Sequence, residues 1–534
     1  MNSNLDAYIS DGTPERVRER YRRLSDLAKE SDFGDLDENI VVIDTETTGF
    51  SFNHDELTQI AAARMEHGEV VDWYVTFVNP GKAIPDDVAH LTNIHDEDVA
   101  DAPSPDEALA GLVEFAGDAK IVAHNAEFDR TFTTRHPSGY PLLDNIWIDS
   151  LDLARIALPR MRSHRLIDLV KAFGAPTSTH RADDDVAATC ALFRILLAAV
   201  HEMPPALVKC IALLAPVEQW NTAVVFQYFA QPEAKSFSLK ELRHESMTSY
   251  ERKPRIDAKM VQSMEYPTAE DIAQAFSPTG IVGKLYGDFE PREEQLTMAQ
   301  EVRAAFEASE NLVVEAGTGV GKSMAYLVPA VLMAKANNIA IGVATKTNAL
   351  LDQLVYHELP ALAQSLGDIT YAPLKGFSHY PCLRKVNRFV KEGVKMVDVQ
   401  GTKYSQAPSL GALLSFIDQT DYDDMDSLKM DYRVVPRRAV TTTSHDCLRR
   451  KCPFYGTTCF VHGARRFAET ADVVVTNHTL LFCDAAADNG LLPPVRHWIL
   501  DEAHGAEAEA RRAFSLEIAA EDVVRLAQKV ASGE

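Results

Sequence analysis

The chain has 534 residues, of which 46% are hydrophobic and 25% charged, and its formal net charge is −25. This composition is typical of a folded protein with several domains, and the negative charge argues against a general polyanion binder. No apolar run reaches the roughly 18 residues of a membrane span, and the N-terminus has no apolar signal segment. We therefore expect a cytoplasmic protein without membrane contact, whose seven cysteines are reduced or bind metal.

The first part of the chain leads into a pair of carboxylates. Residues 1–36 are predicted to be a charged, solvated extension with one helix, Pro14–Lys29. A short buried strand, Ile40–Ile43, is followed by DTETTG (44–49). Side chains alternate along a strand, so Asp44 and Glu46 project from one face. Adjacent carboxylates repel each other unless cations neutralise them, which predicts a site for divalent metal ions.

Two later segments carry further residues of this kind. The sequence IVAHNAEFD (121–129) is typical of a strand followed by a helix that bears Asp129. The sequence HRADDD (180–185) places His180 and Asp185 before an amphipathic helix, Val186–Val200. A histidine with an unperturbed pKa near ~6.5 can take a proton from water around neutral pH.

These three segments, in this order and spacing, resemble the motifs of DnaQ-like (DEDDh) 3′–5′ exonucleases. The resemblance implies an RNase H-like domain at residues 37–200 that binds two Mg²⁺ or Mn²⁺ ions. Two such ions can activate a water molecule and stabilise the leaving 3′ oxygen. Gln59 stands near a position where the family often has Glu, and we assign it no role. The resemblance implies His180 as the general base and, as metal ligands, Asp44, Glu46, Asp129 and Asp185.

Residues 201–280 show mixed helical periodicity without visible chemistry and are predicted to be a helical connector. The apolar run Asn311–Val314 then leads into EAGTGVGKS (315–323), which is typical of a strand, a Gly-rich loop and a helix. Such a loop turns backbone N–H groups towards phosphate oxygens, and its lysine reaches the β- and γ-phosphates. The loop therefore predicts binding of ATP together with Mg²⁺, and the Ser323 hydroxyl would hold the metal ion. The predicted ATP-binding residues of the loop are Gly317, Thr318, Gly319, Gly321, Lys322 and Ser323.

Other segments are typical of the same kind of ATPase. Gln295, which precedes the loop, is predicted to contact the adenine base of ATP. A side-chain amide suits this role because it can both donate to and accept from one edge of the base. An apolar strand, Val495–Leu500, ends in DEAH (501–504), where Asp501 would hold Mg²⁺ and Glu502 would activate the hydrolytic water. Further buried strands are predicted at Ile339–Thr345 and Val473–Asn477, giving a sheet with its ligand at the carboxyl ends of the strands.

An insertion, residues 376–470, carries four cysteines: Cys382, Cys447, Cys452 and Cys459. Four thiolates can hold an iron–sulfur cluster or a zinc ion. Structural zinc sites usually show two short knuckles, and only one such pair occurs here, which favours the cluster. Basic and aromatic side chains around the cysteines suit single-stranded DNA, although a solvated loop would have a similar composition.

The P-loop, the DEAH sequence and the cysteines together resemble superfamily 2 iron–sulfur helicases of the DinG/XPD group. The resemblance implies a RecA-like ATP-binding lobe at residues 281–534, a [4Fe–4S] cluster and 5′–3′ DNA unwinding. A motor of this kind needs a second RecA-like lobe, which the sequence lacks. We therefore expect a fragment or a split protein, with the second lobe supplied by a missing C-terminal part or by another chain.

The sequence as a whole predicts an α/β protein with two catalytic modules. One is a 3′–5′ exonuclease that acts on single-stranded DNA or DNA with 3′ ends, in repair or replication. The other is the ATP-binding half of a helicase. In one alternative the ATP-binding lobe only regulates the nuclease. In another the chain is a non-catalytic nucleic-acid binding protein, which the complete set of carboxylates argues against.

Overall fold

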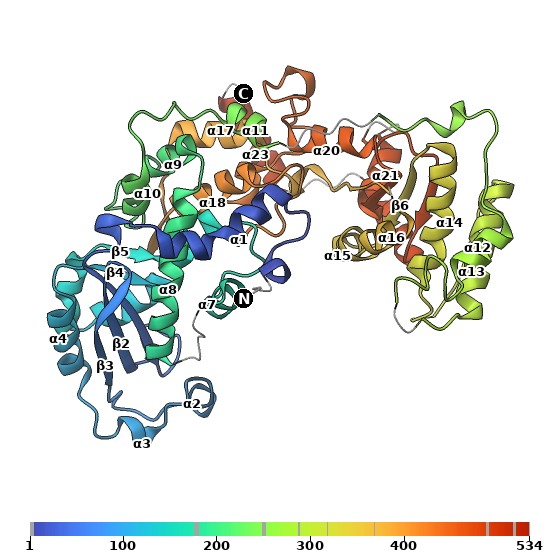
Figure 1. The fold of residues 1–534 in the computed structure, drawn as a ribbon. Coiled ribbons are helices and arrows are strands. Elements are labelled where there is room, and N and C mark those ends of the chain that lie inside the picture. Colours follow the sequence, from blue (N-terminus) through green and yellow to red (C-terminus); the bar gives the residue numbers. More distant parts are fainter. Residues whose placement is uncertain are drawn as a thin grey trace. The chain divides into compact units, whose positions relative to one another are not determined.

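The structure is a computed structural model that describes residues 5–175, 181–247, 253–286, 289–317, 319–367, 369–487, 491–515 and 520–532. Contacts between Cα atoms divide the chain into two compact units. Unit 1 comprises residues 1–248, 381–421 and 425–442, and unit 2 comprises residues 249–380, 422–424 and 443–534. Figure 1 labels the helices and strands of both units.

Unit 1 is organised around a five-stranded sheet with the order β3-β2-β1-β4-β5. The central strand β1 pairs antiparallel with β2 and parallel with β4. Its sequence begins with four buried aliphatic residues, as expected for a strand covered on both faces. The strands are β1 (Ile40–Thr47), β2 (Leu57–Glu66), β3 (Glu69–Phe77), β4 (Lys120–Ala123) and β5 (Trp147–Asp149).

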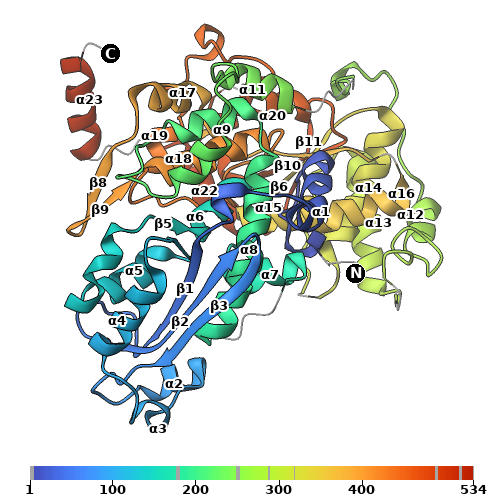
Figure 2. The same cartoon turned by 60° about the vertical axis from the view of Figure 1, so that its left-hand side comes forward.

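Helices cover both faces of this sheet (Figure 2). α4 (Pro105–Ala116) packs on the face that bears Val41 and Ile43. α8 (Ala182–His201) contacts β1 and β2 on the opposite face, which bears Asp44. The other helices of this part are α2 (Asp86–Thr92), α3 (Asp96–Val99), α5 (Ala126–Thr134), α6 (Ser150–Ala157), α7 (Leu166–Phe173), α9 (Pro205–Ala212), α10 (Ala223–Phe229) and α11 (Leu239–Ser246).

Within the described residues, no single helix is long and apolar enough to cross a membrane. One pair of consecutive helices, α8 and α9, passes that test together by length and composition, but the pair is bent by 113°.

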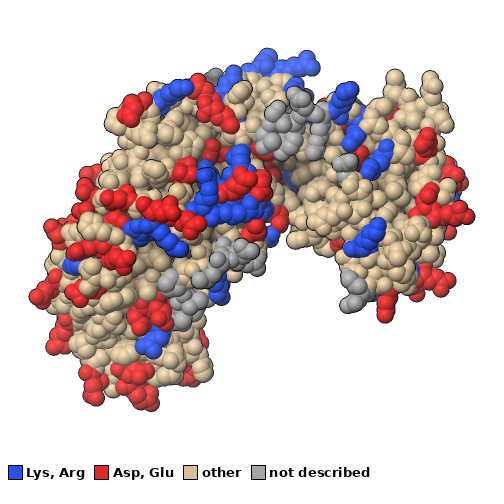
Figure 3. Space-filling model, viewed as in Figure 1, with Lys and Arg blue, Asp and Glu red and all other residues tan. Residues whose placement is uncertain are grey.

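The N-terminal helix α1 (Glu15–Glu30) is part of unit 1, so the predicted solvated extension is wrong. Val17, Tyr21, Leu24 and Ala28 are buried and form one stripe of the helix, which packs against α8. The Tyr21 hydroxyl donates to Oε1 of Gln419 over 2.6 Å. Figure 3 shows Lys and Arg side chains over α1 with Asp and Glu side chains among them. The charged residues of α1 thus lie outside its apolar stripe, and one of them, Arg20, pairs with the buried Asp418 over 3.6 Å.

Much of the predicted insertion also belongs to unit 1. The sequence places residues 376–470 in the ATP-binding lobe, whereas residues 381–421 and 425–442 group with unit 1. α18 (Ala407–Asp418) has an apolar sequence, is almost completely buried and contacts α6, α9 and α11. The elements of this segment are α17 (Leu383–Glu392), β8 (Met396–Val399), β9 (Thr402–Ser405), α18 (Ala407–Asp418) and α19 (Arg437–Val440).

Unit 2 contains a parallel four-stranded sheet with the order β11-β6-β10-β7. Its strands are β6 (Ile341–Thr345), β7 (Tyr371–Pro373), β10 (Val473–Asn477) and β11 (His497–Leu500). Its helices are α12 (Ala269–Ala275), α13 (Glu293–Ala308), α14 (Lys322–Asn337), α15 (Asn348–Gln353), α16 (Leu359–Leu366), α20 (Phe460–Ala468), α21 (His478–Ala486), α22 (Ala506–Ala513) and α23 (Ala520–Ser532). The long apolar helix α14 contributes several of its buried residues to the core.

The strand predicted at Asn311–Val314 is wrong. Residues 311–317 belong to no strand, and Val313 is 95% exposed. An apolar run becomes a strand only where another strand completes its hydrogen bonds, and no described strand pairs with this segment. The strands predicted at Ile339–Thr345, Val473–Asn477 and Val495–Leu500 are present as β6, β10 and β11, of which β6 and β11 begin two residues later than predicted.

Candidate active sites

Three carboxylates meet at the sheet of unit 1. Asp44 and Glu46 lie two residues apart on β1, and Asp185 lies in the first turn of α8. Ligand atoms of these three residues all lie within 4.8 Å of one another. Carboxylate oxygens are the ligands that Mg²⁺ and Mn²⁺ prefer, so the donor set suits a divalent metal. The structure thus brings together three of the four predicted ligands.

The electrostatics of this group show why it would bind a cation. Burial, together with the charges of Asp185 and Asp129, raises the pKa of Glu46 to about 8. Burial, followed by the charges of Asp129, Glu46 and Asp185, raises the pKa of Asp44 well above its ordinary value. Carboxylates packed in this way are unfavourable together as anions, and a divalent cation removes the repulsion.

The fourth predicted ligand, Asp129, lies on α5 and is only 2% exposed. Its Oδ1 accepts a hydrogen bond of 2.8 Å from the hydroxyl of Thr45, which lies between the two carboxylates of β1. Burial raises the pKa of Asp129 to about 7, although the hydrogen bonds of Thr45 oppose this rise. Asp129 also raises the pKa values of Asp44 and Glu46, so it belongs to the same electrostatic cluster. His180, the predicted general base, lies outside the described residues.

Gln59 is a residue of this site that sequence reasoning missed. It lies opposite Glu46 in the register of β1 and β2 and is 1% exposed. Its Oε1 accepts a hydrogen bond of 3.3 Å from the backbone N–H of Ala182, the first residue of α8. Gln59 therefore joins the strand next to Glu46 to the helix turn that carries Asp185.

A chain of hydrogen bonds fixes the turn after β4. The ring of His124 contacts Ser150 Oγ through Nδ1 and the backbone carbonyl of His164 through Nε2, each over 2.9 Å. The carbonyl can only accept, so Nε2 carries the proton and Nδ1 accepts from the hydroxyl of Ser150. Burial lowers the pKa of His124 to about 4, so the ring is neutral at physiological pH. His124 has no nitrogen left for a metal and instead shapes this turn.

In unit 2, the structure brings the two predicted ATPase motifs together. Lys322, the first residue of α14, contacts Oε1 of Glu502 through its Nζ over 3.1 Å. Gly319 and Gly321 have φ angles of 82° and 84°, in the left-handed region that glycine adopts without strain. Asp501 follows β11, and its backbone N–H donates to Ala344 on β6. A nucleotide phosphate bound at this loop would replace Glu502 as the partner of the Lys322 ammonium group.

Gln295 lies against the loop itself. Its Nε2 donates to the backbone carbonyl of Gly321 over 2.9 Å, and the residue is 5% exposed. A Cβ atom at Gly321 would stand 2.1 Å from this Nε2, so the close contact requires glycine. Gly317 and Ser323 lie on either side of this contact in the chain, and Thr318 is outside the described residues. Contact with adenine stays a prediction for Gln295.

The four cysteines lie in different parts of the chain's fold. Cys382 precedes α17 in unit 1, and Cys447, Cys452 and Cys459 are in unit 2. Cys447 Sγ lies 3.7 Å from Nε2 of His462 and accepts from the backbone N–H of Arg449 over 3.4 Å. Among the described residues, the tight ligand grouping found for the carboxylates does not occur for the cysteines. Their ligation of a cluster stays a prediction.

A basic cavity within unit 2 is lined by the residues between Cys447 and Cys452. It has a volume of about 520 Å³, and its lining includes the rings of Phe377, Tyr455 and His462. The guanidinium of Arg465 lies 4.7 Å from the ring centre of Phe377. Cations next to aromatic rings suit a single strand, with its phosphates and its stacking bases. Its basic residues are Arg449, Arg450, Lys451, Arg465 and Arg466.

Comparison with known proteins agrees with this geometry. Residues 41–193 match the RNase_T family, described as an exonuclease. The "3'-5' exonuclease DinG" of Bacillus subtilis (strain 168) is 29% identical over 490 residues, which are 89% of this chain and 50% of that protein. The "ATP-dependent helicase DinG" of Mycobacterium tuberculosis (strain ATCC 25177 / H37Ra) is 38% identical over 226 residues, 40% of this chain and 34% of that protein.

A solved structure, "Exonuclease X in complex with 5' overhanging duplex DNA", is 26% identical and covers 30% of this chain and 90% of its own, with a TM-score of 0.25. A TM-score this low supports no inference.

Unit 1 has an RNase H-like exonuclease fold, and its residues 41–193 match the RNase_T family. Over most of its length the chain is homologous to the DinG proteins, which are named as 3′–5′ exonucleases and as ATP-dependent helicases. The resemblance predicted from the sequence is confirmed, as is the α/β fold class. The chain spans about half the length of the Bacillus relative and a third of the mycobacterial one.

Proposed function

We propose that this chain is a divalent-metal-dependent 3′–5′ exonuclease that removes nucleotides from single-stranded DNA ends. The observation that carries the proposal is the group of Asp44, Glu46 and Asp185, whose ligand atoms lie within 4.8 Å of one another. Metal ions held there would supply an activated water and stabilise the leaving 3′ oxygen. The matching exonuclease family supports the same reaction.

The residues of the chain have separate roles in this proposal. Asp44, Glu46, Asp129 and Asp185 hold the metal ions. Asp129 is kept in place and more acidic by the Thr45 hydroxyl. Gln59 fixes the start of α8 and thereby the position of Asp185. His180 would take the proton of the attacking water.

We also propose that unit 2 is the ATP-binding half of a DinG-like helicase. The contact between Lys322 and Glu502 supports it, because both motifs must act on one nucleotide. A [4Fe–4S] cluster held by the cysteines at 382, 447, 452 and 459, with zinc as the alternative, is part of this proposal. So is a second motor lobe, from a further part of the protein or from another chain.

The test is time-resolved digestion of a single-stranded oligonucleotide labelled at the 3′ or at the 5′ end, with Mg²⁺ or Mn²⁺ and with or without ATP. We expect mononucleotides to be released from the 3′ end first. Asp44→Ala should remove this activity, because it takes away a shared metal ligand.

The outcomes separate the alternatives. Release that is the same with and without ATP would show an independent exonuclease, whereas a change on adding ATP would favour a nuclease regulated by unit 2. Release from the 5′ end would contradict the polarity. DNA binding without cleavage under any metal condition would contradict the nuclease and favour a binding protein.

A further inference from the structure

We propose that a basic groove of unit 1 binds the phosphodiester backbone of a DNA strand upstream of its 3′ end. The groove has a volume of about 590 Å³ and lies beside the turn after β4. The residues that matter for the proposal are His124, Arg155, Arg162, His164, Arg165 and Lys429. We call it the Arg165 groove. The inference rests on the proposed exonuclease function and adds a second contact region for its substrate.

The charge of the Arg165 groove is one-sided. Four cationic side chains line it, and no carboxylate does among the described residues. The chain as a whole has a net charge of −25, so the charge of this groove is opposite in sign to that of the chain. Cationic grooves of this kind gain affinity for nucleic acid by releasing counterions from the phosphates.

The cationic side chains of the groove differ in whether they already have an ion-pair or hydrogen-bond partner within the protein. Arg162 is held by Asp11 over 2.6 Å, so its charge is largely neutralised. Within the described residues, neither Arg165 nor Lys429 has an ion pair or a side-chain hydrogen bond, and Arg155 Nε is buried without a hydrogen-bond partner. Arg165 and Lys429 therefore offer their charges to a phosphate, whereas Arg155 Nε is buried away from the surface of the groove.

The wall of the groove is fixed. His124 donates to the carbonyl of His164, and the ring of His164 bonds the carbonyl of Leu158 over 3.0 Å through Nε2. Burial lowers the pKa values of both histidines to about 4, so their rings are neutral at physiological pH. The positive charge of the groove thus comes from arginine and lysine and does not change around neutral pH. A strand would meet a preformed surface.

The groove and the carboxylates lie at the same edge of the sheet. β1 and β4 are parallel, with Val42 opposite Val122, so their carboxyl ends carry Asp44 and His124 at equivalent levels. The residue after His124, Asn125, lines the groove and precedes α5, which bears Asp129. A strand whose 3′ end lies at the carboxylates therefore has the groove next to it.

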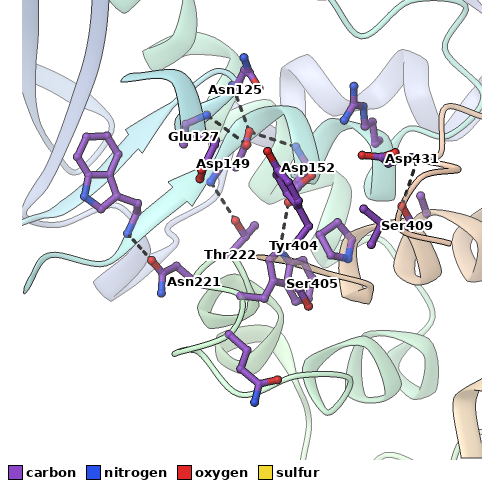
Figure 4. A pocket seen from close by; sticks show the side chains of 18 of the residues that line it. Asn125, Glu127, Asp149, Asp152, Asn221, Thr222, Tyr404, Ser405, Ser409 and Asp431 are labelled. Carbon is purple, nitrogen blue, oxygen red and sulfur yellow. Dashed lines mark hydrogen bonds between the residues drawn. The ribbon is translucent and has the colours of Figure 1, made fainter. Parts of the chain in front are cut away.

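A neighbouring cavity shows what the rest of this surface is like. It has a volume of about 690 Å³ and shares Asn125, Arg155 and Lys429 with the groove. Figure 4 shows Asp149 and Asp152 around this cavity, together with residues of the β8–β9 segment. Burial raises the pKa of Asp152 to about 7, as does the charge of Asp149. The lining of this cavity carries carboxylates as well as cations, so its charge is mixed, whereas that of the groove is one-sided.

The test uses the double variant Arg165→Ala/Lys429→Ala of the full chain and a matched control, Lys171→Ala. Lys171 is an exposed cation of α7 that does not line the groove. Binding of a fluorescent 30-nucleotide poly(dT) is measured with Ca²⁺ at several salt concentrations. We expect the double variant to bind at least about fivefold more weakly, and its log Kd against log salt to have a slope shallower by about 1.4. The control should match the native chain.

A second readout separates groove binding from damage to the fold. The ratio of kcat/KM for a 20-nucleotide strand to that for a trinucleotide is measured with Mg²⁺. Loss of the groove lowers this ratio, whereas partial unfolding lowers both values and leaves the ratio unchanged. Native affinity and native salt dependence of the double variant would overturn the proposal. A native chain that binds DNA through the groove and cleaves nothing would overturn the nuclease function but not the groove.

Discussion

Oε1 of Gln59 accepts a hydrogen bond of 3.3 Å from the backbone N–H of Ala182, and this bond joins two elements that carry metal ligands. Gln59 is opposite Glu46 in the sheet, and Ala182 is three residues before Asp185. The three carboxylates must keep their spacing to share metal ions. The bond holds the strand and the helix in one arrangement without placing another charge in the site.

Gln59→Ala is expected to lower exonuclease activity and to raise the Mg²⁺ concentration needed for half-maximal rate, each by about 10- to 100-fold. Groups that orient metal ligands typically have effects of this size. Magnesium titration of the initial rate measures it. Gln419→Ala is the matched control, because this glutamine is also fully buried in unit 1 but bonds Tyr21 and Ala157. An unchanged magnesium requirement in Gln59→Ala would contradict the role.

The raised pKa values of the carboxylates predict how stability without metal depends on pH. The pKa of a glutamate in an unfolded chain is near ~4, whereas burial and the neighbouring charges raise the pKa of Glu46 to about 8 in the folded chain. Between these values the folded chain binds more protons than the unfolded chain, so the free energy of unfolding falls as the pH rises. Thermal unfolding in EDTA should therefore show a lower Tm at pH 8 than at pH 5.

Adding Mg²⁺ should raise the Tm more at pH 8 than at pH 5, because the ligands are then ionised. Asp185→Asn removes the charge that most raises the pKa of Glu46 and should flatten the pH dependence. A Tm in EDTA that rises between pH 5 and pH 8, in parallel for the native chain and this variant, would speak against the assignment.

Thr45→Val should shift the acidic limb of the pH–rate profile to higher pH. The Thr45 hydroxyl lowers the pKa of Asp129 by donating to it, and valine has the same shape without the donor. Activity at pH 7 should fall, and part of it should return at pH 9. Rate profiles at saturating Mg²⁺ test this. An equal loss at all pH values would indicate a purely structural effect.

Lys375 is a buried charge whose removal should destabilise unit 2. Its Nζ lies 3.0 Å from Asp352 and 2.8 Å from Asp424, and its side chain is 2% exposed. Lys375→Ala leaves Asp424 without this cation and should lower the free energy of unfolding by about 3 kcal/mol. Urea unfolding measures the change. Arg496→Ala, which breaks an exposed ion pair with Asp257, is the comparison and should have little effect.

Lys322→Ala should weaken the binding of a fluorescent ATP analogue at least about tenfold, because the lysine supplies the charge that meets the phosphates. Glu502→Gln removes the same ion pair but keeps the lysine. This second variant should bind the analogue at least as tightly as the native chain. Native affinity in Lys322→Ala would place the nucleotide elsewhere.

The sequence was sufficient where local pattern and chemistry agree. The alternation in β1 placed Asp44 and Glu46 on one face, and the structure has them there. The helix predicted at Val186–Val200 is α8, which begins earlier, at Ala182. Its acidic first turn is stabilised by the helix dipole and so belongs to the helix, not to the preceding loop.

The remaining features depend on partners far away in the chain. Gln59 lies in an apolar strand, and nothing near it in the sequence reveals its bond to α8, 123 residues later. The apolar run Asn311–Val314 resembles a strand, but pairing decides whether one forms. The spacing of Val17, Tyr21, Leu24 and Ala28 in the sequence indicates an apolar stripe on α1, but only the fold shows that α8 packs against this helix.

The bond between Tyr21 and Gln419 joins residues 398 positions apart inside one unit. During synthesis, the nascent chain would present the N-terminal helix and most of the nuclease sheet long before α18 leaves the ribosome. The last segment of unit 1 ends at residue 442, so this unit is complete only after residues 249–380 of unit 2 have been made. An excised piece ending near residue 200 would lack the cover that α18 provides, and a working minimal nuclease has to retain it.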